Sequence, residues 1–299
     1  MWLFDPYRLA VAQPFQRPSW GSGQETIVGA ALAWWDPGMQ HATSDDGTLI
    51  AFHQVGHGAP VVIVGGAFST AEAGAPLAAA LAAAGLSGVT VDRRARGNSG
   101  DTAPYAPARE AEDLAAVIDA IGGGAAVIGH SSGAVLALFA AAEGVPMRHL
   151  FLSEPPFRFG EGEPSTDLPE RLQALVDDGH AEEAVVLFQR EAVGLPDPVI
   201  EQIRSSPMFA SLVPLAQSTV YDALLTQAVS TPTAAMIGVE LPVTILRGEP
   251  TFPMLVEATD RLAELMPHAE LVVVPESRDH GVDPAGTVRE MRRRLALPR

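Results

Sequence analysis

Cysteine is absent from this sequence of 299 residues. Its absence excludes disulfide bonds, thiolate metal sites and a cysteine nucleophile together. Lysine is absent as well, so all 19 basic residues are arginine, and the formal net charge is -17. A nucleic acid is therefore not an expected partner, because a polyanion binds best to a basic surface. A phosphate-binding loop of the P-loop type is also excluded, because that loop requires a lysine.

Long apolar runs are missing too. The apolar stretch 29–35 stops at Asp36-Pro37-Gly38, well short of the roughly 20 residues that a membrane-spanning helix needs. The N-terminus lacks the basic region, the continuous apolar region and the small-residue cleavage site of a signal peptide. Short acidic turns occur without a second set of ligands. We therefore expect a cytoplasmic protein with no membrane span, no metal and no cofactor.

Residues 1–38 differ in character from the rest of the chain. They are irregular and rich in proline, glycine and tryptophan, whereas the whole chain is 47% hydrophobic, enough for one large domain with a sizeable core. Two interpretations of this extension stay open. It is either an arm that packs over the domain or extra sequence from a start codon assigned too early.

From Met39 onward, short apolar runs typical of buried strands alternate with alanine-rich stretches typical of helices. This alternation implies right-handed crossovers between parallel strands and a sheet covered by helices on both faces. The sequence therefore predicts an α/β fold. The expected elements are strands at 47–55, 60–64, 88–92 and 125–128 and helices at 71–84 and 108–121.

One strand end carries the pattern G-x-S-x-G. It reads Gly129-His130-Ser131-Ser132-Gly133, directly after the strand 125–128 and directly before a predicted helix at 134–143. This context is typical of a nucleophile elbow, in which a tight strand-to-helix turn projects a serine hydroxyl and the flanking glycines avoid neighbouring backbone. The helix N-terminus supplies unpaired N–H groups that suit a developing oxyanion. We therefore predict that Ser131 is a nucleophile.

From about residue 42 to the end, the sequence resembles the α/β-hydrolase superfamily. Besides the elbow, Gly65-Gly66-Ala67-Phe68 follows an apolar strand where the family carries its oxyanion turn, with a glycine in place of the usual histidine. The resemblance implies a mostly parallel sheet with helices on both faces and a helical cap. It also implies that the N–H groups of Ala67 and Ser132 stabilise the oxyanion.

The resemblance also places a histidine base on the loop after the last strand. His280 follows a predicted strand at 271–275 and precedes a predicted helix at 287–295, whereas the other histidines lie in turns or at element edges. We expect His280 to take the proton of the nucleophile and to return it to the leaving group. The segment 92–100 resembles the family's D-x-R-G-x-G-x-S loop, and we expect its arginines to form ion pairs.

The resemblance also implies a third catalytic residue, a carboxylate that orients the histidine and completes a catalytic triad. At this residue the sequence departs from the family pattern. The resemblance places an aspartate where this chain has Thr251, and a threonine carries no charge to hold an imidazolium. Glu154, which ends a predicted strand as in haloalkane dehalogenases, and Glu249 are the two candidate replacements. We prefer Glu154, because a carboxylate at the end of a buried strand points toward the rim of the nucleophile. The alternative roles are an ion pair with Arg94 or Arg96 for Glu154, and a solvated turn for Glu249.

The segment 155–239 differs from the core and resembles the family's cap, which covers the nucleophile and forms the ceiling of the substrate pocket. Its apolar residues recur at helical spacing in the stretches 168–178, 181–192, 197–205 and 213–229. The predicted organisation is an extension at 1–38, core at 39–154, cap at 155–239 and core again at 240–299. Candidate pocket residues are Phe68, His130 and Phe157, together with Phe159, Met208, Phe209, Met236, Phe252 and Met254.

The sequence thus predicts a cofactor-independent serine hydrolase acting on a small-molecule acyl substrate, namely a carboxylic ester, thioester or lactone. Ser131 would form an acyl-enzyme and His280 would act as the base. Two alternatives stay open. The first, which the missing aspartate suggests, is a lyase, cyclase or acyltransferase on the same fold. The second is a binding module without turnover, because a fold alone does not establish chemistry.

Overall fold

A computed structural model describes residues 38–295 of the chain, so nearly all of the predicted extension 1–38 lies outside the described residues. Within 38–295 the strands form one sheet in the order β1-β2-β4-β3-β5-β6-β7-β8. β1 and β2 pair antiparallel to their neighbours, and the remaining pairs are parallel. The strands are β1 (Gln40–Thr43), β2 (Leu49–Gly56), β3 (Pro60–Val64), β4 (Ser87–Val91), β5 (Ala126–His130), β6 (His149–Ser153), β7 (Val243–Gly248) and β8 (Glu270–Val274).

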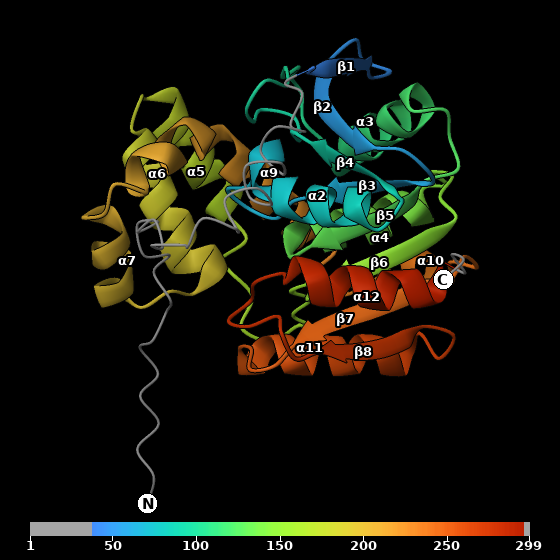
Figure 1. Ribbon diagram of the computed structural model, residues 1–299. Coiled ribbons are helices and arrows are strands. Elements are labelled where there is room, and N and C mark those ends of the chain that lie inside the picture. The colour runs from blue at the N-terminus through green and yellow to red at the C-terminus, as the bar shows by residue number, and fades with distance from the viewer. Residues whose placement is uncertain (1–37, 296–299) are drawn as a thin grey trace, which may run out of the picture.

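Helices cover both faces of this sheet (Figure 1). Alternate residues of the central strand β3 enter different cores: Val61 and Ile63 pack with α2 and α12, whereas Val62 and Val64 pack with α3, α4 and α11. Both faces of the parallel strands are therefore buried, which explains their continuous apolar runs. The helices are η1 (Ala71–Gly74), α2 (Ala75–Ala83), α3 (Pro107–Ala120), α4 (Ser132–Ala142), α11 (Pro253–Leu265) and α12 (Pro284–Arg294).

A group of helices lies between β6 and β7 in the chain, and most of them form a lobe beside the sheet, whereas the last, α10, packs against α4 of the sheet domain (Figure 1). We call residues 154–242 the helical insertion. Its apolar core includes Leu172, Val185 and Val220, and Phe68 from the sheet domain packs against it. The elements are α5 (Leu168–Asp177), α6 (Ala181–Leu187), the π-helical turn η2 (Phe188–Val193), α7 (Asp197–Arg204), α8 (Phe209–Leu212), η3 (Val213–Leu215), α9 (Ala216–Ala228) and α10 (Ala234–Ile237).

The insertion also contains the clearest differences from the sequence prediction. The stretch 181–192 is divided into α6 and the wider turn η2, and α8 and α10 were not predicted. A π-turn keeps nearly the same apolar spacing as an α-helix, and a helix of four residues is too short to show a period. None of the helices between residues 38 and 295 combines the length and the apolar character needed to cross a bilayer.

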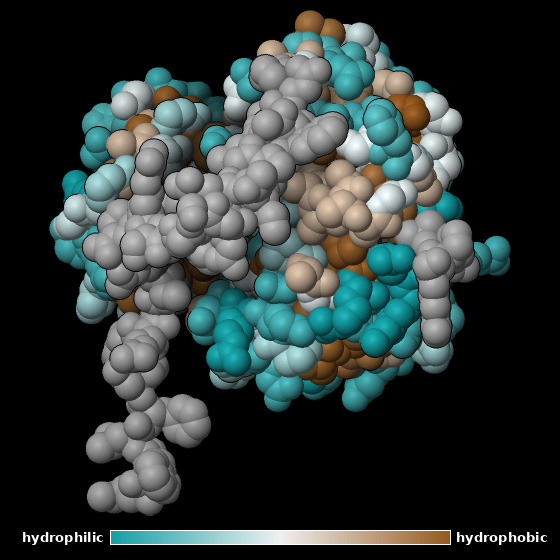
Figure 2. Space-filling model, viewed as in Figure 1, coloured by the Kyte–Doolittle hydropathy of each residue, from teal (hydrophilic) through white to brown (hydrophobic). Residues whose placement is uncertain are grey.

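The hydropathy of the outer surface differs from one element to the next. Figure 2 shows a hydrophilic surface over α12, whose last turn carries Arg292, Arg293 and Arg294, and an apolar surface over the edge strand β8. Arginine side chains at a helix C-terminus interact favourably with the helix dipole. The carboxyl ends of β3, β5, β6, β7 and β8 meet at another edge of the sheet, the place at which α/β sheets generally bind their ligands.

Candidate active site

Ser131 occupies a strained turn between β5 and α4. Its backbone has φ 54° and ψ -126°, a conformation that non-glycine residues rarely adopt. The N–H of Ser131 donates to the carbonyl of Ser153 in β6, 2.9 Å away, and the carbonyl of Ser131 accepts from Ala134 in the first turn of α4. Strain of this kind costs about 1–3 kcal/mol and persists only where the surroundings impose it. The strand, the helix and the neighbouring strand therefore fix the position of the serine.

Two glycines of the motif are required by close backbone contacts. A Cβ atom added at Gly129 would lie 2.3 Å from the carbonyl oxygen of Gly133. A Cβ atom added at Gly133 would lie 2.3 Å from the carbonyl oxygen of Val64 and 2.5 Å from that of Gly65. Real Cβ atoms do not approach backbone so closely, because the packed interior cannot yield by that amount. The elbow and the turn after β3 are therefore held directly against each other.

Glu154 and His280 are in direct contact. Glu154 follows β6 with φ 47°, and its N–H donates to Leu246 in β7 at 3.0 Å. Its Oε2 lies 2.6 Å from Nδ1 of His280, and its Oε1 accepts the N–H of Gly248 at 2.8 Å. The carboxylate is 2% exposed and the imidazole 25% exposed. A buried carboxylate thus faces one nitrogen of a histidine that remains accessible.

The electrostatics of this pair favour a charged glutamate. Burial opposes ionisation of Glu154, but the hydrogen bonds from His280 and from the N–H of Gly248 outweigh it and lower the pKa of the carboxyl group. An ionised carboxylate only accepts hydrogen bonds, so Nδ1 of His280 carries the proton in this contact. Nε2 of the neutral imidazole is then left as an acceptor for another proton.

Glu249 and the arginines of segment 92–100 have other surroundings. Glu249 is exposed, and its N–H donates to Ser277. Arg94 pairs with Asp113 and Asp46, so it does not take Glu154 as a partner. Of the two carboxylates considered from the sequence, only Glu154 has a hydrogen bond to His280 among those found within residues 38–295.

His130 packs against the same histidine. The two ring centroids are 4.6 Å apart, and Nε2 of His130 donates to the backbone carbonyl of His280 at 2.9 Å. Burial and the nearby His280 lower the pKa of His130 to about 4. His280 itself has φ 64° and follows Asp279 with φ 52°, and the N–H of Asp279 donates to Pro250. A neutral histidine from the elbow therefore helps to hold the strained loop that carries His280.

The free energy of unfolding is expected to fall as the pH drops from about 6.5 to about 4, because burial lowers the pKa of His130 and of His149 to about 4. In this window the unfolded chain binds protons that the folded chain resists, so acid favours unfolding by about 1.4 kcal/mol per pH unit for each histidine. Urea unfolding across the window measures the slope. His149→Gln should reduce it, and His180→Gln, at an exposed site, is the control. A flat profile would contradict the prediction.

The turn after β3 lies against Ser131. A Cβ atom added at Gly66 would be 2.8 Å from Cβ and 3.4 Å from Oγ of Ser131. Ala67 follows in this turn, and Ser132 opens α4, where the first N–H groups of a helix have no partner within the helix. The positive end of the helix dipole lies at the same place. The structure thus places the turn that contains Ala67 against the serine that Ser132 follows.

The aromatic residues predicted for the pocket have different environments. Phe68 packs edge-on against Phe188 of the insertion, with 5.4 Å between ring centroids. Phe157 is buried in the main core beside Phe159. Phe252 is 40% exposed, and its ring lies 6.5 Å from that of His280. Phe252 is therefore the aromatic side chain that combines exposure with contact to the histidine.

A buried ionic cluster lies behind the turn after β3, and sequence reasoning anticipated only part of it. Arg93 pairs with Glu110 and Asp222, and Arg96 also pairs with Asp222. Ion pairing of these arginines was expected, but Asp222 comes from α9 in the insertion, more than 120 residues away in the chain. No local pattern marks a residue as the partner of such a distant arginine. Within the described residues no group of three or more metal-ligating side chains is present.

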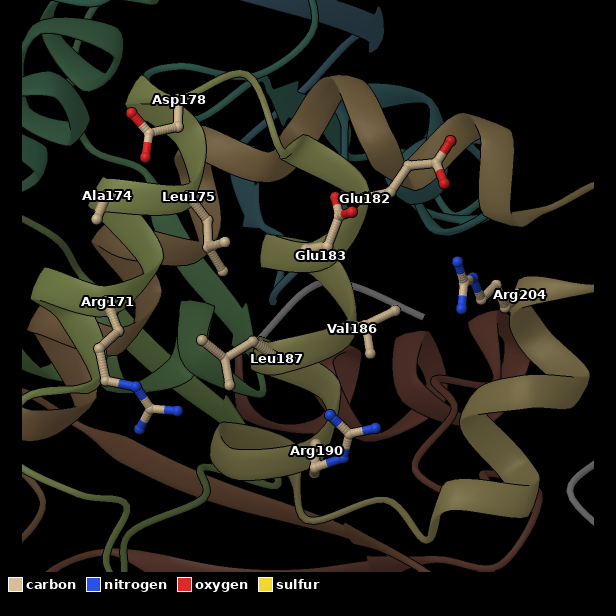
Figure 3. A pocket seen from close by; sticks show the side chains of 10 residues that line it. All are labelled: Arg171, Ala174, Leu175, Asp178, Glu182, Glu183, Val186, Leu187, Arg190 and Arg204. Atoms are coloured by element: carbon tan, nitrogen blue, oxygen red, sulfur yellow. The ribbon is translucent and has the colours of Figure 1, made fainter.

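A cavity of about 510 Å³ lies in the insertion, among α5, α6, η2 and α7 (Figure 3). Its lining combines the apolar side chains of Leu175 and Val186 with the guanidinium groups of Arg171, Arg190 and Arg204. None of the predicted site residues lines it. This cavity is separate from the edge of the sheet that carries Ser131 and His280.

Residues 55–290 match the model of the Alpha/beta hydrolase family. An alpha/beta hydrolase from Sphaerobacter thermophilus is 39% identical over 84% of this chain and 98% of its own, with a TM-score of 0.78. Two esterases share the fold. RhEst1 from Rhodococcus is 23% identical over 86% of this chain and 98% of its own, with a TM-score of 0.60. EaEST from Exiguobacterium antarcticum is 18% identical over 86% of this chain and 97% of its own, with a TM-score of 0.61. The chain matches no curated protein.

Proposed function

This chain belongs to the alpha/beta hydrolase family, and on that premise we propose that it is a serine hydrolase of carboxylic esters, thioesters or lactones. The family match and the sheet topology confirm the predicted α/β-hydrolase fold. The family and its solved neighbours also support a hydrolase in general. The observation that carries the finer proposal is the 2.6 Å contact between Glu154 and His280 at the edge that also carries the strained Ser131.

The proposed reaction has two halves. Oγ of Ser131 attacks the carbonyl carbon, its proton passes to Nε2 of His280, and the carbonyl oxygen becomes an oxyanion. The N–H groups of Ala67 and Ser132 stabilise that oxygen, a contribution of about 10²–10³ in rate for each donor in comparable sites. The tetrahedral intermediate collapses as His280 protonates the leaving group. Water, deprotonated by the same histidine, then attacks the acyl carbon, and the second tetrahedral intermediate collapses to the free acid as His280 returns the proton to Oγ of Ser131.

Glu154 remains ionised throughout the proposed reaction. Its hydrogen bond to Nδ1 keeps the proton on that nitrogen and stabilises the imidazolium that forms when Nε2 takes the serine proton. The non-hydrolytic alternative was motivated by Thr251 at the usual aspartate position, and the binding alternative by the fact that a fold alone does not establish chemistry. The hydrogen bond between Glu154 and His280 supports catalysis over both alternatives.

The substrate pocket is proposed to lie between the sheet edge and the insertion, with residues 155–239 acting as a cap. Phe68 joins the two parts through Phe188, and Phe252 lies next to His280 at the surface. Apolar side chains at these places favour a substrate with an apolar acyl or alcohol portion over a highly charged one.

The proposal is tested with the full chain, a fluorophosphonate probe and p-nitrophenyl butyrate in water enriched in oxygen-18. We expect one adduct per chain, located on Ser131 by peptide mapping, and butyrate that contains one solvent oxygen atom. A folded chain that takes up no probe would overturn the proposal. Turnover without solvent oxygen in the product would favour the lyase or transferase alternative.

A further inference from the structure

The ionic cluster behind the turn after β3 is electrically balanced and almost fully buried. Arg93 and Arg96 provide two positive charges, Glu110 and Asp222 provide two negative charges, and all four residues are buried. Arg93 forms a two-pronged contact with Glu110 at 2.6 and 2.8 Å and reaches Oδ1 of Asp222 at 2.9 Å. Nη2 of Arg96 reaches Oδ2 of Asp222 at 2.7 Å. Burial opposes ionisation of Asp222, but the two arginines outweigh it and lower the pKa of its carboxyl group.

Arg96 holds the peptide group that contains the N–H of Ala67. Its Nη1 donates to the carbonyl oxygen of Gly66 at 2.5 Å, and that oxygen also accepts the N–H of Ser69 at 3.2 Å. The carbonyl of Gly66 and the N–H of Ala67 belong to one planar trans peptide unit, so they point in opposite directions. A fixed carbonyl therefore fixes the direction of the N–H. The positive charge of the Arg96 guanidinium beside this oxygen also polarises the peptide and strengthens the N–H of Ala67 as a donor.

The other predicted oxyanion donor contacts the same cluster. Nη1 of Arg93 lies 3.3 Å from Oγ of Ser132 and 3.4 Å from the carbonyl oxygen of Gly65. The hydroxyl of Ser132 also interacts with the carboxylate of Asp222. The cluster thus contacts Ser132 through its hydroxyl and, through the carbonyl of Gly66, the peptide group that carries the N–H of Ala67.

Stability alone does not account for this arrangement. A buried ion pair gains little over apolar residues of the same volume, because removing the charges from water offsets most of their attraction. In addition, Nε of Arg96 is buried and has no hydrogen-bond partner within the described part of the chain. An unpaired buried donor is costly. The guanidinium is oriented so that Nη1 donates to Gly66 and Nη2 to Asp222, and this orientation leaves Nε without a partner.

We propose that Arg96 and Asp222 are positioning residues of the oxyanion site, which fix the Gly66–Ala67 peptide and join it to helix α9 of the insertion. This inference rests on the proposed serine hydrolase function. Neither side chain is assigned contact with the substrate. Arg96 acts through the peptide of the turn, and Asp222 acts through Arg96.

The test uses the double variant Arg96→Met/Asp222→Asn, which removes one charge of each sign and leaves the Arg93–Glu110 pair in place. With p-nitrophenyl butyrate we expect kcat to fall about 100-fold, the lower end of the loss caused by removing one oxyanion donor. KM should not change, because the oxyanion forms after binding. Affinity for phenylboronic acid, which adds to Ser131 and places an oxygen at the oxyanion position, should fall by a similar factor.

The matched control is Arg94→Met/Asp113→Asn, an ion pair from the same loop with Nη2 of Arg94 2.7 Å from Oδ1 of Asp113. No contact of Arg94 or Asp113 with residues 65–68 occurs among the hydrogen bonds of the described chain. The control should lower the melting temperature without changing kcat or boronic acid affinity. Circular dichroism establishes that both variants are folded.

Three results would overturn the inference, and they are distinguishable. If the wild-type chain is not labelled by fluorophosphonate on Ser131, the proposed function fails and the inference fails with it. If the wild type is labelled and the folded Arg96→Met/Asp222→Asn variant keeps its kcat, only the positioning role is wrong. If both double variants lose kcat equally, the ion pairs are merely structural and the positioning role is again wrong.

Discussion

The Ser131→Ala variant is expected to lose about 10⁶-fold in kcat on p-nitrophenyl butyrate, because serine hydrolases lose about that much when the nucleophile is removed. In the proposed mechanism Oγ of Ser131 forms the acyl-enzyme, whereas His280, hydrogen-bonded to Glu154, serves only as the base. Folding should be preserved, because alanine only removes one oxygen from a side chain at the surface of the elbow. The measurement is steady-state turnover, together with intact mass after exposure to the fluorophosphonate probe.

The neighbouring serine supplies the control for this experiment. Ser132→Ala keeps the backbone N–H that opens α4 and removes only a hydroxyl that contacts Arg93. We expect this variant to be labelled on Ser131 with the wild-type stoichiometry. Labelling that survives in Ser131→Ala and disappears in Ser132→Ala would show that the nucleophile had been assigned to the wrong serine.

The Glu154→Gln variant is expected to lose about 10⁴-fold in kcat, comparable to the loss when a triad aspartate becomes asparagine. Glutamine has nearly the same shape as glutamate, so the contact with Nδ1 at 2.6 Å remains occupied. The amide carries no charge to stabilise the imidazolium, and its N–H₂ group favours the wrong tautomer of His280. Turnover and the pH dependence of kcat together separate this effect from a loss of folded protein.

Glu249→Gln is the matched control, because it makes the same chemical change at the other carboxylate near the usual acid position. Glu249 is exposed, so its replacement should leave kcat and the pH profile as they are in the wild type. The assignment would have to be reversed if Glu249→Gln proved the more damaging change. Equal activity of both variants and the wild type would mean that neither carboxylate orients His280.

The sequence was sufficient for those parts of the fold and site that depend on local pattern. The strand-to-helix turn at Ser131 is encoded by glycines whose close backbone contacts are found in the structure, at Gly129 and Gly133. His280 was located by its place after the last strand. Glu154 could be preferred over Glu249 because parallel strands end at one edge of a sheet, so a residue after β6 lies beside a residue after β5.

The parts that were missed depend on long-range packing. Asp222 lies within an insertion helix with no special pattern around it, and only the folded chain places it between Arg93 and Arg96. The hydrogen bond from His130 to the His280 carbonyl likewise joins residues 150 positions apart. A side chain that contacts the backbone of a distant segment is not marked by any periodicity or motif in the sequence around it.

The order of the elements along the chain has a consequence for synthesis. Ser131 and the turn after β3 precede the insertion and Glu154 is its first residue, whereas His280 follows β8, the strand at the edge of the sheet. A ribosome makes the chain from its N-terminus, so the proposed nucleophile, donors and carboxylate are synthesised before the proposed base. If the proposed mechanism holds, a growing chain has no activated serine to react with metabolites until the segment after β8 has been made.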